Sequence, residues 1–190
     1  MKIILASQSP RRKELLARLI DDFDVIVADV DESLYHYHYY DLAYELSKLK
    51  AYEIFKSHPD DLIIASDTIV ILEGKVFEKP RDHEDARQMI KALQGRTHQV
   101  ITSYTLISKN QEITRSITTD VLFRQVDDNE IDEYIKTKIP YDKSGGYGIQ
   151  NPDFNFVKSY DGELENVMGL PIREIAKDLE THFKIKLKTR

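Results

Sequence analysis

Short apolar runs alternate with amphipathic stretches from the start of the chain. Residues 3–6 form the first apolar run, and the pattern predicts a helix from residue 10 to about residue 20 and a second strand at residues 23–27. Apolar residues at helical spacing predict a long helix from residue 41 to about residue 56. This order of strand, helix and strand is typical of an α/β protein.

Residues 62–72 are apolar except at their centre, where Ser66, Asp67 and Thr68 stand between two β-branched runs. We expect these polar residues to interrupt the strand, because burying a carboxylate without a partner is costly. Glu73 and Gly74 predict a turn into a further strand at residues 75–77.

Capping residues mark the next helices. Asp82 is placed to cap a helix that ends at Gly95, and Asp127 with Glu130 forms a capping box for a helix that runs to about residue 136. Pro171 opens a last helix with an apolar face.

Two hairpins complete the predicted elements. Residues 99–108 and 113–124 predict a long antiparallel hairpin, and residues 154–160 and 163–167 predict another across Asp161-Gly162. We therefore expect an α/β fold with a mixed twisted sheet flanked by helices, in which two lobes surround a cleft. Residues 1–190 are expected to form one domain, because the sequence contains no internal repeat and no flexible linker.

Composition narrows the classes of function. The 190 residues are 41% hydrophobic and 32% charged, as in a soluble globular protein, and the net charge of −6 counts against a nucleic-acid-binding surface. No apolar run approaches the roughly 18 residues of a membrane span, and residues 3–6 are too few for a signal-peptide core, so we expect a cytoplasmic protein. The absence of cysteine excludes thiolate catalysis and cysteine-bound zinc.

Three cations occupy the start of the first helix. Ser9 is the expected N-cap and Pro10 the first helical residue, and Arg11, Arg12 and Lys13 follow directly. Cations are unfavourable by about 0.3–1 kcal/mol each at the positive end of a helix dipole, where anions are favoured. The sequence therefore predicts a phosphate site at this helix start.

Several other polar residues are candidates, each with a purely structural alternative. Asp67 either hydrogen-bonds local backbone at a bulge or strand end, or faces a ligand at the carboxyl edge of the sheet. Asp31 and Glu32 either lie in a solvated loop or offer oxygen ligands to Mg²⁺ or Mn²⁺. Lys50 lies on the long helix, where lysine usually faces solvent. Lys79 follows Glu78, and this segment is equally a surface turn or one that brings a cation to the cleft.

Three of the seven glycines stand at positions 145, 146 and 148, close to Lys143. Such a loop lets backbone N–H groups approach a phosphate, although it is equally an ordinary turn and lacks the spacing of a P-loop. The alternate histidines of the run Tyr-His-Tyr-His-Tyr-Tyr at residues 35–40 suggest a metal site, but a loop that shields a cleft or packs on a partner suits its aromatic residues better. His98 is expected to be a hydrogen-bonded structural histidine.

Four segments carry a resemblance to a known family. Residues 5–12 (LASQSPRR), 66–68 (SDT), 78–80 (EKP) and 142–150 (DKSGGYGIQ) together resemble the Maf family of nucleotide pyrophosphatases, and segments 30–32, 50–51, 95–98 and 167–171 also fit it. The resemblance covers nearly the whole chain. The sequence departs from the usual family pattern at Ser144, Gly146 and Asn151, where alanine, alanine and glycine are common.

The resemblance implies a house-cleaning hydrolase of inosine-triphosphatase-like fold that acts as a homodimer. Such an enzyme converts a nucleoside triphosphate to the monophosphate and pyrophosphate with Mg²⁺ or Mn²⁺. Three positions separate the substrate subclasses in this family, and the residues Arg11, Thr68 and Gln150 are similar to those of the group that prefers dTTP and UTP.

The implied mechanism is attack of water on the α-phosphorus. We expect Asp67, Lys79 and Glu32 to be catalytic, with Asp67 as the general base and with Glu32 and Asp67 as metal ligands. Phosphate binding is assigned to five residues: Ser7, Arg11, Arg12, Lys50 and Lys143. The alternative is a nucleotide-sensing regulator of cell division and septum formation, which would bind the nucleotide without turnover.

Overall fold

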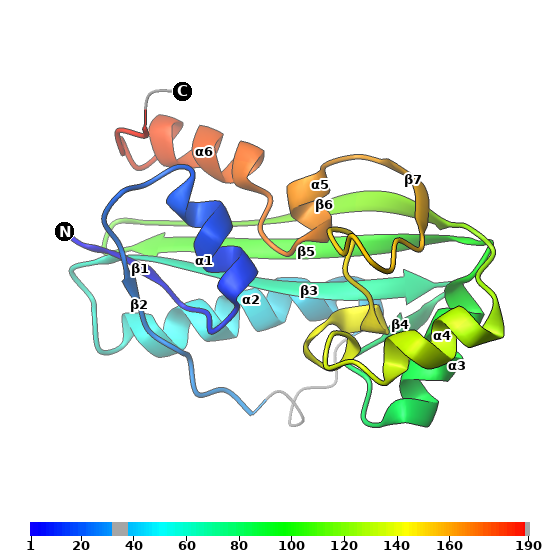
Figure 1. Cartoon of the computed structure of the whole chain (residues 1–190). Helices are drawn as coiled ribbons and strands as arrows, with labels where there is room; N and C mark the ends of the chain where they lie inside the picture. Colours follow the sequence, from blue (N-terminus) through cyan, green and yellow to red (C-terminus); the bar gives the residue numbers. More distant parts are fainter. Residues whose placement is uncertain (32–37, 189–190) are drawn as a thin grey trace. The chain divides into compact units, whose positions relative to one another are not determined.

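A mixed sheet organises the described part of the chain, residues 1–31 and 38–188 of a computed structural model (Figure 1). Its strands are β1 (Ile3–Leu5), β2 (Asp24–Val25), β3 (Leu62–Leu72), β4 (Lys75–Phe77), β5 (Thr97–Ser108), β6 (Gln111–Phe123) and β7 (Val157–Asp161). The strand order is β2-β1-β3-β5-β6-β7, and β4 pairs with β3. Strand β1 is parallel to β2 and β3, whereas the β3–β4 and β6–β7 pairs are antiparallel. The predicted mixed sheet is confirmed.

The described helices are α1 (Pro10–Ala17), α2 (Tyr39–Phe55), α3 (His83–Leu93), α4 (Asp128–Ile135), α5 (Leu164–Val167) and α6 (Ile172–Thr181), with short 3-10 turns at Pro140–Asp142 and Ser144–Gly146. Helices α1, α3 and α4 begin where the sequence places their caps, whereas the long helix predicted from residue 41 begins at Tyr39 without a side-chain cap. The side chains of Ser9, Asp82 and Asp127 each accept a hydrogen bond from the backbone N–H three residues later. These side chains satisfy helix-start donors that would otherwise lack partners.

The chain divides into two compact units. Unit 1 comprises Met1–Asp67, Thr102–Ile117 and Met168–Arg190, and unit 2 comprises Thr68–Ile101 and Thr118–Val167. The predicted single domain with two lobes around a cleft stays a prediction. None of the described helices is both long enough and apolar enough to cross a membrane.

Unit 1 is built around the parallel strands β1 and β3, paired in the register Ile4 to Ile63. One of its clusters of buried residues is formed by Ile4, Ala6, Ala51, Ile54, Ile63, Ala65 and Ile107. Strand β2 has two residues, Asp24 and Val25, where a strand over residues 23–27 was predicted, and both are exposed. The edge of the sheet is therefore short and solvated on this side.

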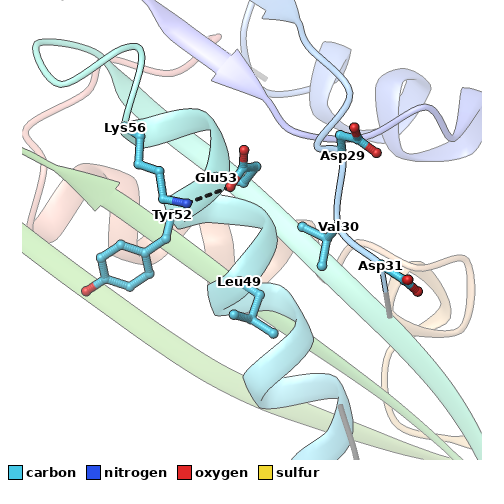
Figure 2. Close-up of a pocket in the computed structure, with 7 residues that line it drawn as sticks. All are labelled: Asp29, Val30, Asp31, Leu49, Tyr52, Glu53 and Lys56. Carbon is cyan, nitrogen blue, oxygen red and sulfur yellow. Dashed lines mark hydrogen bonds and ion pairs between the residues drawn. The ribbon is translucent and has the colours of Figure 1, made fainter. Parts of the chain in front are cut away.

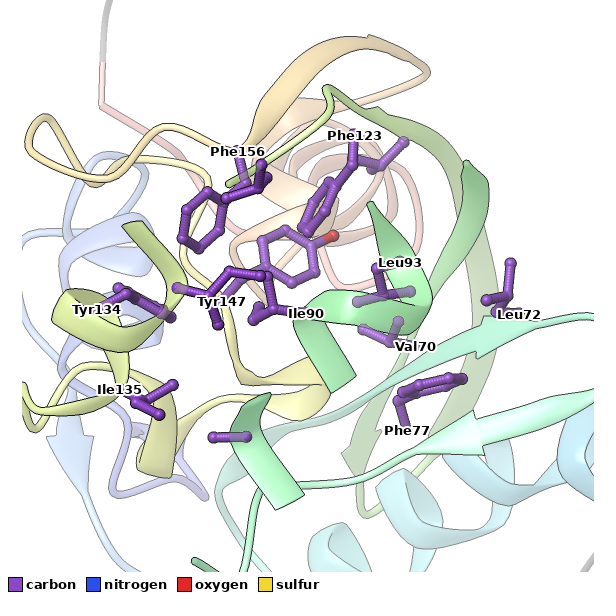
Figure 3. Packing of buried hydrophobic residues seen from close by; sticks show 14 of the residues in the cluster. Val70, Leu72, Phe77, Ile90, Leu93, Phe123, Tyr134, Ile135, Tyr147 and Phe156 are labelled. Carbon is purple, nitrogen blue, oxygen red and sulfur yellow. The ribbon is translucent and has the colours of Figure 1, made fainter. Parts of the chain in front are cut away.

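Unit 2 has a core rich in aromatic side chains. Phe123, Tyr134, Tyr147 and Phe156 are buried together with aliphatic residues of β3 and α3 (Figure 3). Helices α3 and α4 lie side by side and contribute to this core (Figure 1). Aromatic side chains of this size contribute much of the apolar area that a core removes from water.

Two predictions from the sequence are wrong. Strand β3 runs without interruption from Leu62 to Leu72, although we expected Ser66, Asp67 and Thr68 to break it. Both Ser66 and Asp67 are buried there. The strand continues because Asp67 has a partner on α2 and the Ser66 hydroxyl donates to the carbonyl of Gly169. Asp67 accordingly lies within a strand and not at a strand end.

The predicted hairpin of residues 154–160 and 163–167 does not form. Strand β7 pairs with β6, and residues 164–167 form the one-turn helix α5. Thr119 of β6 explains this, since its hydroxyl accepts from the N–H of Glu163 and donates to the carbonyl of Glu163. The side chain of Asn166 also donates to Thr119. These contacts hold residues 163–166 beside β6 in a helical turn.

Candidate functional site

The start of α1 is held by two serine hydroxyls. The Oγ atom of Ser7 accepts from the backbone N–H of Ser9 at 3.1 Å, and the Oγ atom of Ser9 accepts from the N–H of Arg12 at 3.4 Å. Ser7 is buried and Ser9 is half-buried. The segment that the sequence assigns to phosphate binding thus has a fixed conformation.

Arg12 joins three segments of unit 1. Its Nη1 atom donates to the carbonyl of Ser66 at 2.7 Å, and its Nε atom donates to the carbonyl of Gly169 at 2.9 Å. The Ser66 hydroxyl donates to the same Gly169 carbonyl at 3.1 Å. A planar guanidinium suits such a double contact. Arg12 therefore connects α1 to β3 and to the segment before α6.

The buried carboxylate of Asp67 faces Lys50. The Nζ atom of Lys50 donates to Oδ1 of Asp67 at 2.6 Å, and the two side chains are 15% and 10% exposed. The structural alternative for Lys50, a lysine that faces solvent, does not hold, and its assignment to phosphate binding stays a prediction. Leu46 and Ile54, four residues before and after Lys50, are both buried and place it on the inner face of the helix. That spacing was visible in the sequence.

Arg11 and Glu32 are the other candidates of unit 1. Arg11 is half-buried in the first turn of α1, beside Arg12. Glu32 lies outside the described residues, as do residues 35–37 of the aromatic and histidine run. The predictions that concern them stay predictions.

Unit 2 carries the remaining candidates around its glycine loop, residues 143–150. The hydroxyl of Ser144 donates to the carbonyl of Thr68 at 2.9 Å, and the N–H of Gly145 donates to the carbonyl of Glu78 at 3.0 Å. Lys79 follows Glu78 and is exposed. The loop thus contacts both Thr68 and Glu78, which are ten residues apart in the sequence.

Lys143 and Gln150 lie on this loop. The Nζ atom of Lys143 donates to the carbonyl of Ile139 at 2.6 Å and pairs with the carboxylate of Asp142, and its side chain is 15% exposed. Gln150 is exposed, as a side chain that selects a ligand from solution can be. The ammonium of Lys143 therefore contacts its own loop.

A metal ion would find few protein ligands among the described residues. They contain no group of three or more histidine, aspartate or glutamate side chains placed to hold an ion. Mg²⁺ commonly uses one or two carboxylates together with substrate phosphates and water. Asp67 fits that role as a single carboxylate, with one oxygen already bonded to Lys50.

Unit 1 also contains a pocket of about 270 Å³. It is lined by residues of α2 and of the segment after β2, namely Asp29, Val30, Asp31, Leu49, Tyr52, Glu53 and Lys56 (Figure 2). Lys56 donates to Glu53 at 2.8 Å within the pocket. Of the predicted metal-binding segment, residues 30–32, the described residues Val30 and Asp31 face this pocket.

Sequence reasoning missed several residues that hold the site. Gly169, Tyr134 and Tyr147 supply contacts to Arg12 or to the glycine loop, although no chemistry was assigned to them. The signal that the sequence offered for Gly169 was its place in one of the segments that fit the family pattern. The contacts themselves join residues far apart in the chain, so no local pattern reveals them.

Comparison with known proteins identifies close relatives over almost the whole chain. A family model described as "Maf-like protein" matches residues 2–182. The chain is 44% identical over 188 residues to a protein of Pyrococcus furiosus named dTTP/UTP pyrophosphatase, with 97% of each chain covered. A protein of Thermosipho africanus with the same name is 46% identical over 175 residues, which cover 92% of this chain and 90% of that protein.

One solved structure shows the same fold at low sequence identity. The Staphylococcus aureus Ham1 protein matches with a TM-score of 0.56 and 13% identity, covering 95% of this chain and 98% of that one. This likeness supports the fold alone, and it confirms the predicted α/β architecture.

Proposed function

Because this chain belongs to the family of Maf-like proteins, we propose that it hydrolyses dTTP and UTP to the nucleoside monophosphate and pyrophosphate. The observation that carries this proposal is the match over 97% of the chain to a relative named dTTP/UTP pyrophosphatase. The residues Arg11, Thr68 and Gln150, which the family pattern connects with this substrate group, support the choice of pyrimidine nucleotides.

The proposed chemistry centres on the carboxylate of Asp67. Asp67 accepts a proton from water as that water attacks the α-phosphorus, and pyrophosphate leaves. The contact with Lys50 at 2.6 Å holds the carboxylate in one orientation before substrate arrives. Preorganised charge of this kind contributes much of the rate enhancement in phosphoryl transfer.

Cations stabilise the charge on the phosphate oxygens. In unit 1, Ser7, Arg11 and Arg12 are proposed to bind phosphates at the start of α1, and in unit 2 Lys79 and Lys143 neutralise charge. Glu32 and Asp67 would hold a divalent cation, Mg²⁺ or Mn²⁺. Such an ion, when bound, supplies further charge neutralisation at the triphosphate.

The direct test is turnover of four nucleotides by the purified protein. We expect dTTP and UTP to yield pyrophosphate and monophosphate with Mn²⁺ or Mg²⁺, with CTP and GTP slower, and EDTA to stop the reaction. Asp67→Asn should lower kcat by at least about a hundredfold, since general base catalysis contributes roughly 10²–10⁴. The matched control is Asp60→Asn, since Asp60 is an exposed aspartate of the same unit.

The outcomes separate the candidate functions. Release of orthophosphate in place of pyrophosphate would contradict attack at the α-phosphorus. Tight binding of all four nucleotides without turnover would favour the nucleotide-sensing regulator. Unchanged pyrophosphate release by Asp67→Asn would show that Asp67 is not the base.

The family resemblance also supports a homodimer in the cytoplasm. Tyr40, 54% exposed at the start of α2, belongs to the aromatic run that is a candidate for the dimer surface. Light scattering coupled to size exclusion should give about twice the chain mass of 22.1 kDa. A mass equal to one chain at micromolar concentration would contradict the dimer.

A further inference from the structure

Two buried polar side chains, His98 and Tyr147, meet beneath the glycine loop of unit 2. His98 is 1% exposed and Tyr147 is 6% exposed, and Nε2 of His98 shares a hydrogen bond of 2.7 Å with the hydroxyl of Tyr147. The proposed chemistry uses neither residue. Burying a polar group costs free energy unless the group is hydrogen-bonded. The position of two such groups beneath the loop therefore suggests a role in holding it.

Aromatic packing fixes the two rings. Phe123 meets both of them edge to face. Its ring centroid lies 4.9 Å from that of His98. It lies 4.6 Å from that of Tyr147, which Figure 3 shows beside Phe123. Such edge contacts favour one relative orientation of each pair of rings. Both rings are therefore held in one orientation at their hydrogen bond of 2.7 Å.

Both groups are uncharged at neutral pH. Burial lowers the pKa of His98 from 6.5 to about 4, against a smaller upward effect of the Arg96 backbone. Burial also raises the pKa of Tyr147 above its ordinary value. The pair is thus a hydrogen bond between two groups that are neutral at pH 7.

Tyr147 lies in the centre of the glycine loop, and the loop is tied down on both sides of it. The hydroxyl of Tyr134 donates to the carbonyl of Gly146 at 2.9 Å, and the N–H of Gly145 donates to the carbonyl of Glu78 at 3.0 Å. These anchors come from α4, from Glu78 directly after β4 and, through His98, from β5. The loop is therefore held by three separate elements of unit 2.

The loop in turn determines where Lys143 lies. A Cβ atom added at Gly148 would stand 3.0 Å from Cε and 3.4 Å from Cδ of Lys143. The Lys143 side chain therefore crosses Gly148, the residue after Tyr147. A displacement of Tyr147 would therefore also displace Gly148, against which the Lys143 side chain packs.

We propose that His98 is a positioning residue: through Tyr147 it holds the glycine loop in the conformation that presents Lys143 and Gln150 to a nucleoside triphosphate. This inference deepens the proposed function and rests on it, because those two residues act only on a bound nucleotide. His98 itself does not contact the nucleotide. The displacement of a phosphate-binding side chain by about 1 Å can lower a rate by about a hundredfold.

The first measurement needs no substrate. Amide hydrogen exchange of residues 143–150 is compared between the wild type and Tyr147→Phe, which removes only the hydroxyl. We expect exchange in the loop to become about tenfold faster, since a buried hydrogen bond contributes roughly that factor. Tyr134→Phe, which removes a second anchor of the same loop, should give a similar increase.

The second measurement is steady-state hydrolysis of dTTP and UTP. Tyr147→Phe and His98→Leu should lower kcat/KM by about ten- to a hundredfold. His98→Gln should recover most of this loss, because its amide can reach the position of Nε2 and bond the Tyr147 hydroxyl. A residue that is only structural would not show this recovery by the conservative variant.

Tyr104→Phe is the matched control. Tyr104 is also fully buried, its hydroxyl also bonds a side chain at 2.7 Å, that of Asp178, and both residues belong to unit 1. This variant should lower stability and leave both loop exchange and kcat/KM within about twofold of the wild type. Equal losses in Tyr104→Phe and Tyr147→Phe would overturn the proposal.

The remaining outcomes are also decisive. Wild-type loop exchange in both Tyr147→Phe and Tyr134→Phe would show that these hydroxyls do not hold the loop, and the inference would be wrong. If the wild type hydrolyses neither dTTP nor UTP, the proposed function fails. Loop exchange still reports in that case whether His98 and Tyr147 hold the loop.

Discussion

The ammonium of Lys50 donates to the buried carboxylate of Asp67 at 2.6 Å, and this contact joins the inner face of α2 to the middle of β3. The two side chains are 15% and 10% exposed. Removing one member of such a pair leaves the other charge without its buried partner, which is more damaging than removing both. Stability therefore requires that neither charge is buried without its partner, whereas the proposed activity requires the carboxylate of Asp67.

We predict that Lys50→Met lowers the free energy of unfolding by about 3–5 kcal/mol. The double variant with Lys50→Met and Asp67→Asn should recover most of that stability, because no unpaired charge is then buried. The double variant should nevertheless lack pyrophosphatase activity, because it has lost the carboxylate of the proposed base, Asp67. Urea unfolding followed by circular dichroism, together with pyrophosphate release, measures both quantities.

Lys56→Met on the same helix is the control for this prediction. Lys56 pairs with Glu53 at 2.8 Å, but its side chain is 73% exposed. Exposed pairs contribute about 0–1 kcal/mol, so this variant should remain close to the wild type in stability. A double variant less stable than Lys50→Met would contradict the argument from the buried charge.

The two arginines of α1 are predicted to separate by their effects. Arg12→Lys loses a guanidinium that donates to the carbonyls of Ser66 and Gly169, so it should lower stability by about 1–3 kcal/mol and lower kcat/KM. Arg11→Lys should change stability by less than about 0.5 kcal/mol. Its effect should appear in the ratio of kcat/KM for dTTP and CTP.

Unfolding in urea and initial rates with both nucleotides test this separation. If Arg12→Lys is as stable as the wild type, the two carbonyl contacts contribute little. If Arg11→Lys leaves the ratio of the two nucleotides unchanged, Arg11 does not select the substrate.

Local chemistry made the starts of α1, α3 and α4 predictable. The caps Ser9, Asp82 and Asp127 act on N–H groups three residues away, so a short stretch of sequence contains both partners. The continuity of β3 was not predictable in this way. It depends on Lys50, 17 residues before Asp67, and on Gly169, 103 residues after Ser66.

The candidate site was likewise predictable only where its partners lie close together in the sequence. Local motifs predicted Asp67, Arg12 and Lys143 as site residues, because their residue types and local order are characteristic of a phosphate site. The sequence did not show that Arg12 bonds the carbonyl of Gly169, 157 residues away. A side chain with such a distant partner is assigned by geometry, and only its type can be read locally.

Two glycines of the loop are predicted to respond differently to alanine. Gly145 has φ of +72°, and a Cβ there would stand 3.0 Å from Cγ2 of Val70, so Gly145→Ala should lower stability by about 1–2 kcal/mol or more. At Gly148 the added Cβ would meet only the flexible end of Lys143. Gly148→Ala should therefore keep most of the stability and raise KM for dTTP.

Thermal unfolding and KM measurements on the two variants check this difference. The reverse pattern, with an unstable Gly148→Ala and an unaffected Gly145→Ala, would contradict the described loop geometry. An unchanged KM in a stable Gly148→Ala would show that the place of Lys143 does not limit binding.

Buried His98 should make the fold sensitive to mild acid. Because burial lowers the pKa of His98 from 6.5 to about 4, the unfolded chain binds a proton between these values that the folded chain does not. This contribution to stability is complete above about pH 6.5 and is lost as the pH falls toward 4, by up to about 3 kcal/mol.

Urea unfolding of the wild type and of His98→Gln at several pH values separates the contribution of His98 from that of the carboxylates, which both proteins share. The difference in stability between the two should be constant above pH 7 and should shift in favour of His98→Gln as the pH falls. A constant difference down to pH 4 would mean that His98 is protonated in the folded protein as readily as in the unfolded chain.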